Sequence, residues 1–113
     1  MSMADYKGKG IHVQDTPFGY TLSLIGGKWK LIILYVLAEN PSIRFNNIKR
    51  QIGDITYKIL SAQLKELEAD GIVHRKEYSQ VTPKVEYRLT EKGETLLPIM
   101  ESMCEWGTNN QHN

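Results

Sequence analysis

Apolar residues recur with two different periods in the second half of the chain. Residues 56–69 carry three leucines at the i, i+4, i+7 spacing that places side chains on one side of a helix, namely Leu60, Leu64 and Leu67. Residues 84–89 alternate apolar and polar positions, which predicts a strand with one buried face. The basic segment 72–78, with its β-branched residues, predicts the partner strand, and residues 79–83 predict the hairpin tip between them.

The other segments predict four further helices and one very short strand. These elements are helices over residues 17–25, 28–39, 45–52 and 91–106, and a strand near 42–45. Thr16 and Pro17 begin the first helix as an N-cap hydroxyl followed by proline, and Thr56 and Thr90 are the expected N-caps of the helices over residues 56–69 and 91–106. Segment 28–39 is apolar on nearly all sides and therefore predicts a central buried helix. Pro98 lies inside the last helix and is expected to kink it.

A helix-turn-helix followed by a β-hairpin is the order of a winged helix. We therefore predict an α+β fold, mostly α, in which the hairpin is the wing. The length of 113 residues fits one domain with a single core. We place this domain at residues 15–113, behind a polar and mobile tail at residues 1–14.

The helix over residues 56–69 has a narrow polar side opposite its leucines, formed by Lys58, Ser61, Ala62 and Lys65. Bulky side chains would hold a helix away from the base edges of DNA, whereas this side is slim enough to enter the major groove. Thr56 and Tyr57 lie at the helix N-terminus, where free N–H groups and the helix dipole favour a phosphate. A solvent-exposed face without a partner is the alternative that the residues leave open.

Basic residues concentrate in the predicted DNA-binding part. The net charge of +1 gives no argument for an anionic partner, but residues 44–88 hold nine basic and six acidic side chains. Lys84 lies beside the hairpin tip, where it could reach a minor groove or the DNA backbone. Arg44 and Arg75 are candidate phosphate contacts. Lysines on a hairpin also protect edge strands from aggregation, which is the alternative for this segment.

The last predicted helix carries apolar side chains over a wider face than one intramolecular contact needs, among them Leu97, Met100, Met103, Cys104 and Trp106. We therefore predict a homodimer held by helix packing. Its two-fold symmetry would place two half-sites on double-stranded DNA about one helical turn apart, or a multiple of this distance. The alternative is a helix that lies wholly on its own core.

Five segments resemble the HxlR family of bacterial transcriptional regulators, which are winged-helix relatives of the MarR group. They are LSLIGGKWKLIIL (22–34), RFNNIKRQI (44–52), LSAQLKELEADGIVHRKEY (60–78), PKVEYRLTEKGETLLP (83–98) and EWG (105–107). The resemblance implies a cytoplasmic homodimer that binds a pseudo-palindromic operator and regulates a nearby gene. It also implies that the first and last helices form most of the dimer interface, which adds Tyr20 and Leu24 to the candidates.

The resemblance raises the question of redox sensing. Many family members have a Cys-Pro pair where this chain has Thr16-Pro17, and in several that thiol senses quinones, aldehydes or oxidants. A hydroxyl cannot form a thiolate, so this route does not extend to Thr16. Cys104 is the only thiol, and its place on an apolar helix favours a packed cysteine over a sensor. A redox signal or a reactive small molecule stays the candidate effector.

The sequence gives no support for catalysis. Its three histidines are scattered, and it contains no paired carboxylates, Ser/His/Asp set, metal-ligand spacing or phosphate-binding glycine loop, so we expect no enzyme, cofactor or metal. A single cysteine fits a reducing cytoplasm, and no apolar run is long enough for a membrane span. The alternative function is a winged helix that contacts a protein instead of DNA, because a fold does not fix its function.

Overall fold

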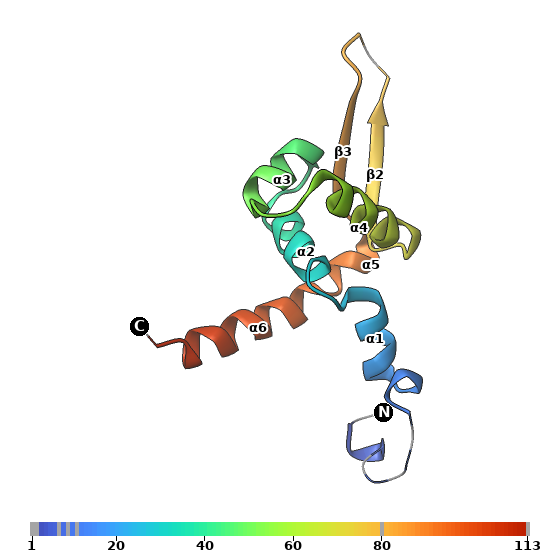
Figure 1. The fold of residues 1–113 in the computed structure, drawn as a ribbon, viewed down its shortest axis with the longest axis vertical. Coiled ribbons are helices and arrows are strands. Elements are labelled where there is room, and N and C mark those ends of the chain that lie inside the picture. Colours follow the sequence, from blue (N-terminus) through green and yellow to red (C-terminus); the bar gives the residue numbers. More distant parts are fainter. Residues whose placement is uncertain (1–2, 7, 9, 11, 80, 113) are drawn as a thin grey trace.

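The chain folds into the predicted order of elements, with one change near the C-terminus. In the computed structural model they are η1 (Met3–Tyr6), η2 (Val13–Asp15), α1 (Pro17–Ile25), α2 (Lys30–Glu39), β1 (Ile43–Arg44), α3 (Phe45–Ile52), α4 (Tyr57–Ala69), β2 (Val73–Tyr78), β3 (Lys84–Leu89), α5 (Glu91–Glu94) and α6 (Leu97–Asn110). The structure describes residues 3–6, 8, 10, 12–79 and 81–112, so Gln80 of the predicted hairpin tip lies outside the described residues. The winged-helix prediction is confirmed (Figure 1).

Helix α2 provides one wall of a core to which every long element of the domain contributes. Leu34 of α2 is fully buried in the same cluster as Ile48 of α3 and Leu64 of α4. Removing one such side chain from water contributes about 1.5–3 kcal/mol. The prediction that α2 is buried on nearly all sides is wrong for one face, because Ile32 and Tyr35 are 41% and 50% exposed. No other element of the described chain covers these two side chains.

Three threonines begin helices as N-caps, as their positions before helical segments predict. The hydroxyl oxygens of Thr16, Thr56 and Thr90 accept hydrogen bonds from the backbone N–H of Gly19, Ile59 and Gly93, at 3.0, 3.1 and 2.9 Å. The backbone N–H and the hydroxyl of Thr16 also donate to the carbonyl oxygen of Val13. Thus η2 packs against α1, although it belongs to the segment predicted as a tail, and the mobility of that tail stays a prediction.

Thr90 does more than cap α5, because its hydroxyl also donates to the carbonyl of Gly71 at 2.6 Å and so joins α5 to the end of α4. Thr90→Ala is expected to lower the free energy of unfolding by about 1–2 kcal/mol, because the N-cap of α5 and the hydrogen bond to the Gly71 carbonyl are lost together. Urea denaturation followed by circular dichroism measures this loss. Thr90→Ser keeps the hydroxyl and is the control, and an equal loss in the serine variant would assign the effect to the methyl group.

The sheet has the order β1-β3-β2 and is antiparallel throughout. Residues 85, 87 and 89 of β3 point to one face as predicted, because Tyr87 and Leu89 are buried and Val85 packs against the core. Residues directly opposite one another in such a sheet share a face. Arg75 pairs with Tyr87 and therefore lies on this inner face, whereas Glu86 lies on the outer face.

The prediction of one kinked C-terminal helix is wrong, because residues 91–110 form two helices. Helix α5 ends at Glu94, and α6 begins at Leu97, so Pro98 lies in the first turn of a new helix. Within a continuous helix the proline ring would meet the carbonyl four residues earlier, whereas in a first turn its missing N–H costs nothing. The second helix also runs past the predicted end at Trp106 to Asn110, whose side chain donates to the Trp106 carbonyl at 2.9 Å.

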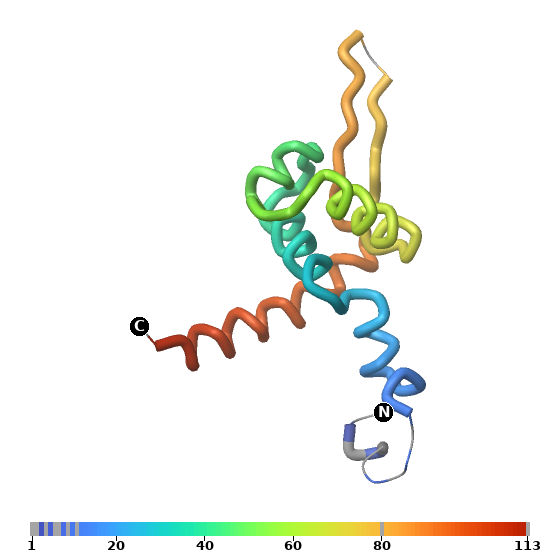
Figure 2. The backbone as a smooth tube through the Cα atoms, viewed as in Figure 1, coloured from blue at the N-terminus to red at the C-terminus, as the bar shows by residue number. Residues whose placement is uncertain are grey.

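The domain has three projections, which are α1 and α6 at one end and the β2–β3 hairpin at the other (Figures 1 and 2). The radius of gyration is 16.5 Å, against about 13 Å for a compact chain of this length. Only Met100 is buried among the residues of α6. A helix of this length is marginal in water unless its apolar side is packed.

Candidate nucleic-acid interface

Helix α4 presents the predicted polar strip to solvent. Its three leucines are buried, with exposed fractions of 0%, 2% and 0% for Leu60, Leu64 and Leu67, so the prediction that they pack inward is confirmed. On the opposite side Lys58, Ala62 and Lys65 are exposed and Ser61 is half-buried. The strip is therefore anchored from behind and open in front, as a helix that enters a groove requires.

The N-terminus of α4 is held against α3 by an aromatic contact. The rings of Tyr57 and Phe45 are stacked with their centroids 5.8 Å apart, and the Lys49 ammonium lies 4.7 Å from the centroid of Tyr57. Tyr57 is 61% exposed, so its ring has one packed and one open side. Lys49 brings a positive charge to the same end of α4 as Thr56, where the free N–H groups also favour an anion. No local pattern in the sequence distinguishes Lys49, because its contact with Tyr57 joins two different helices.

The three predicted contacts from the sheet lie on two different faces. Arg75 is on the inner face with Tyr87, beneath α4. Arg44 pairs with Glu86 and therefore lies on the outer face, as does Lys84, two residues from Glu86 along β3. The structure thus brings Arg75 together with the residues of α4, and keeps Arg44 and Lys84 as a separate pair on the outside of the wing.

Lys84 takes part in a small network on the outer face. Its ammonium lies 3.6 Å from the Glu86 carboxylate and 4.7 Å from the centroid of the Tyr78 ring. A hydrogen bond from the hydroxyl of Ser42 to Glu86, at 3.0 Å, is the main cause that holds the pKa of Glu86 below its usual value. The network ties β1, β2 and β3 together and holds Lys84 near the hairpin tip.

Arg75 reaches from β2 toward α4. Its guanidinium donates to the Glu77 carboxylate at 2.6 Å, and this hydrogen bond, followed by one with Tyr87, raises the pKa of Arg75. The space between sheet and helix is a hollow of about 270 Å³, lined by Ser61, Lys65, Glu68, Arg75 and Tyr87. Three side chains chosen separately from the sequence as DNA contacts thus line one hollow.

A partly buried ion pair joins α2 to the middle of α4. The Lys30 ammonium lies 2.9 Å from the Glu66 carboxylate, and the side chain of Lys30 is only 9% exposed while that of Glu66 is 55% exposed. Since a buried lysine requires a partner, this contact helps to set how α4 lies on the core. Lys30 was not among the residues predicted to have a role, and the available signal was a charged residue at the start of a mainly apolar helix.

Residues 24–113 match the model of the HxlR-like helix-turn-helix family. The matched segment runs from the end of α1 to the end of α6 and so contains the helix-turn-helix, the hairpin and the C-terminal helices. The chain belongs to this family. The family resemblance that the sequence motifs indicated is thereby confirmed, and the fold, the exposed face of α4 and the hairpin are those of an HxlR-like protein.

Curated HxlR-like relatives align with the chain over most of its length. An HTH-type transcriptional regulator of Halalkalibacterium halodurans is 72% identical over 113 residues, which is 100% of this chain and 100% of the relative. The HTH-type transcriptional regulator YdzF of Bacillus subtilis is 52% identical over 94 residues, which is 83% of this chain and 86% of YdzF. Both relatives are named as HTH-type regulators of transcription.

Solved structures support the same fold. The redox regulator HypR in its oxidised form superposes with a TM-score of 0.80 at 52% identity, covering 87% of this chain and 100% of the HypR chain. The reduced form of the transcriptional regulator YodB from B. subtilis gives a TM-score of 0.75 at 35% identity, covering 86% of this chain and 95% of YodB. The winged helix-turn-helix is therefore shared with regulators of this family.

The predicted dimer residues of this HxlR-like chain fall into three groups. Tyr20, Met103 and Trp106 are 58%, 53% and 69% exposed. Leu24 and Leu97 are half-buried, and both pack against the core. Met100 is only 7% exposed and belongs to the core of its own chain, so it offers little surface to a partner. Ile99, which belongs to the predicted apolar face of the last helix, is exposed as well, and Phe18 and Leu22 of α1 are exposed apolar side chains outside the predicted set.

Cys104 is exposed on α6. The expectation of a packed cysteine is therefore wrong within the single chain, because α6 leaves the domain after its first turns and nothing in the described chain covers this side.

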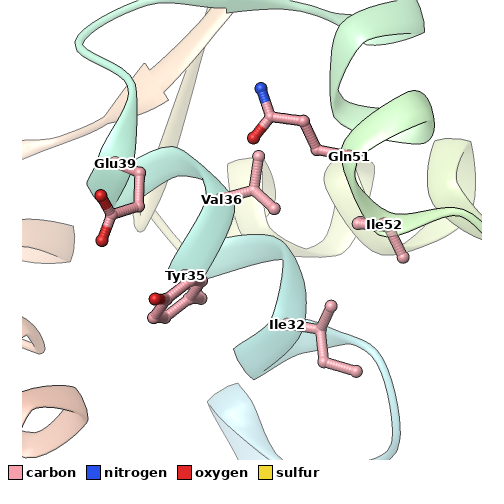
Figure 3. A pocket seen from close by; sticks show the side chains of 6 residues that line it. All are labelled: Ile32, Tyr35, Val36, Glu39, Gln51 and Ile52. Carbon is pink, nitrogen blue, oxygen red and sulfur yellow. The ribbon is translucent and has the colours of Figure 1, made fainter. Parts of the chain in front are cut away.

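A second hollow, of about 280 Å³, lies away from the α4 strip, between α2 and α3 (Figure 3). The side chains of Gln51 and Ile52 come from α3, and those of Ile32, Tyr35, Val36 and Glu39 come from α2. Its walls are mainly apolar, and it includes the two large exposed apolar side chains of α2, Ile32 and Tyr35.

Within the described ranges, no three His, Cys, Asp or Glu side chains gather closely enough to hold a metal ion. No single helix of the described chain has the length and apolar composition of a membrane span, and α1 and α2, which pass that test only together, are bent by 74°.

Proposed function

We propose that this protein regulates transcription by binding operator DNA as a homodimer. In this proposal α4 enters the major groove and the β2–β3 hairpin contacts the adjacent minor groove or its backbone. The observation that carries it is the exposed strip of α4, which is narrow, flanked by Lys58 and Lys65, and supported from behind by three buried leucines. The names of the HxlR-like relatives as HTH-type transcriptional regulators support it.

Each predicted contact has a role that its place supports. Ala62 and Ser61 form the floor of the strip, where a thymine methyl or a base edge could approach the helix backbone. Lys58 and Lys65 flank this floor and can reach phosphates or guanine, and Thr56 and Tyr57 lie at the phosphate-binding helix terminus. From the sheet, Arg44, Arg75 and Lys84 supply cations to the DNA backbone, with Lys84 nearest the hairpin tip.

The proposed dimer packs α1 and α6 of one chain against those of the other. Ile99, Met103 and Trp106 follow an i, i+4, i+7 spacing and form an exposed apolar stripe along α6. An exposed stripe of this kind on a projecting helix marks a protein contact. A two-fold dimer presents two copies of α4 and therefore requires a pseudo-palindromic operator. We place this activity in the cytoplasm, where the operator is accessible.

Signal sensing would use a different residue from the N-terminal cysteine of other family members. Thr16 occupies that position, and its hydroxyl is already engaged with Val13 and Gly19. A redox signal acting directly on this chain would act on Cys104, its only thiol, which is exposed on α6 beside the proposed interface.

The test of this function uses the floor of the strip. Ala62→Leu is expected to weaken binding to the selected operator by about 10-fold or more, because the longer side chain holds α4 away from the base edges. Binding to random DNA, which depends on phosphates, should change much less. The operator is obtained by selection from a random duplex library, and affinities are measured by fluorescence anisotropy at two salt concentrations.

Ala69→Leu is the matched control, since Ala69 is exposed on the same side of α4 two turns nearer its C-terminus. Equal operator affinity in the parent protein and both variants would show that α4 does not enter the major groove. If the parent showed neither selected binding nor a salt dependence, a protein-binding winged helix would replace the proposed function.

A further inference from the structure

The hollow between α4 and the sheet combines charges from elements that are distant in the sequence. Lys65 and Ser61 come from α4, whereas Arg75 comes from β2. The residues that line the hollow include two cations and one carboxylate, Glu68, and a second carboxylate, Glu77, pairs with Arg75 at 2.6 Å from outside this lining. The other lining group of the hollow is the phenol of Tyr87, which is only 8% exposed. These are the groups of a site for a monoanion that accepts hydrogen bonds.

The docking geometry of the proposed function indicates which anion would bind in this hollow. A helix in the major groove and a hairpin in the neighbouring minor groove are separated by one sugar–phosphate backbone. That backbone must cross the protein between α4 and the hairpin, which is where the hollow opens. A backbone phosphodiester carries one negative charge and free oxygen acceptors, so it can accept hydrogen bonds from both cations that line the hollow.

We propose that this hollow, which we name the backbone seat, binds a single DNA phosphate held jointly by Lys65 and Arg75. The proposal rests on the proposed function and adds to it a specific stoichiometry, in which two cations share one phosphate. Ser61 supplies a hydroxyl donor at the same seat, so its contribution is to positioning on the backbone as well as to the floor of the strip. The carboxylate of Glu68 repels the phosphate and so weakens its binding to the backbone seat.

Tyr87 acts in the seat as a positioning residue. It is fixed in the core, is the cross-strand partner of Arg75 and lines the same hollow, and its side chain contributes, after Glu77, to the raised pKa of Arg75. Glu77 holds the guanidinium of Arg75 at 2.6 Å. Arginine side chains lose rotamer freedom on binding, and these two contacts place Arg75 before DNA arrives.

Salt dependence distinguishes a shared phosphate from two separate ones. The logarithm of the binding constant falls with the logarithm of salt concentration by about 0.9 for each phosphate neutralised, irrespective of how many cations contact it. The probe is a fluorescein-labelled duplex of random sequence, about 30 base pairs long, which is long enough for both protomers of a dimer to contact successive turns of the helix. The variants are Lys65→Gln, Arg75→Gln and the double variant, and Lys92→Gln on α5 is the charge-matched control.

Each single variant is expected to weaken binding by about 3-fold with a small change in salt slope, because the other cation still holds the phosphate. The double variant should lose a slope of about 0.9 per protomer, one phosphate. Two equal losses of about 0.9 that add to about 1.8 would show two separate phosphates, and no loss in any variant would show that the backbone passes elsewhere. Either result overturns the seat while leaving DNA binding itself in place.

Tyr87→Phe tests the positioning role. It is expected to weaken DNA binding by about 2- to 5-fold through the loss of one hydrogen bond to a charged group. The same change in the Arg75→Gln background should have no effect on DNA binding, whereas a merely structural role of the hydroxyl would weaken binding equally in both backgrounds. A parent protein that failed to bind the duplex would instead count against the proposed function.

Discussion

Met103→Glu is expected to separate the dimer into monomers and to weaken operator binding by about 100-fold or more, because the second half-site is no longer bound intramolecularly. Met103 is the middle residue of the exposed stripe on α6, between Ile99 and Trp106. A carboxylate there would be buried without a partner in a packed interface, which is strongly unfavourable. Sedimentation velocity and operator anisotropy on the same sample measure the two effects.

Thr108→Glu adds the same charge on the opposite side of α6 and is the control, since Thr108 is exposed and lies about 180° from the stripe around the helix. It should leave the dimer and the operator affinity close to those of the parent protein. Dimers that persisted in the Met103 variant would show that α6 does not form the interface. Monomers that bound the operator as tightly as the parent would show that dimerisation does not contribute to affinity.

Glu66→Ala is expected to lower the free energy of unfolding by about 2 kcal/mol, because it leaves the ammonium of Lys30 in the interior without its partner. Loss of one partner of a fully buried pair costs about 3–5 kcal/mol, and the smaller value is expected because the Glu66 side chain is 55% exposed. The variant should also weaken operator binding, since this contact helps to set the position of α4.

Lys30→Met provides the contrast. It removes the same ion pair but fills the site with an apolar side chain of similar length, so the free energy of unfolding should change by less than about 1 kcal/mol. Adding Glu66→Ala to Lys30→Met should then cost little more. Urea denaturation of the four proteins measures this cycle. Equal losses of unfolding free energy in Glu66→Ala and Lys30→Met would show that the attraction between the two charges stabilises the fold, and that an unpaired buried ammonium is not the cause of the loss.

Periodicity and caps made much of the fold predictable. The leucine spacing in α4, the alternation in β3 and the threonine caps before α1, α4 and α5 are all patterns within one short segment of the chain. Such patterns depend on local backbone geometry, which any single chain carries in its sequence. Pro98 predicted a disturbance of the helix near this position. Whether the helix bends there or ends and begins again depends on the free energies of the two arrangements in the folded protein, which the local sequence does not give.

The sequence by itself determined most of the elements of this protein, their order, and the side of α4 that faces away from the core. The tertiary structure decided what those elements bring together: the partner of Lys30, the separation of Arg75 from Arg44 and Lys84 on opposite faces of the sheet, and the exposure of Ile32, Tyr35 and Cys104. The physical reason is one of range. Periodicity reports which side of an element is apolar, whereas a contact between distant residues depends on strand register and on how the elements pack.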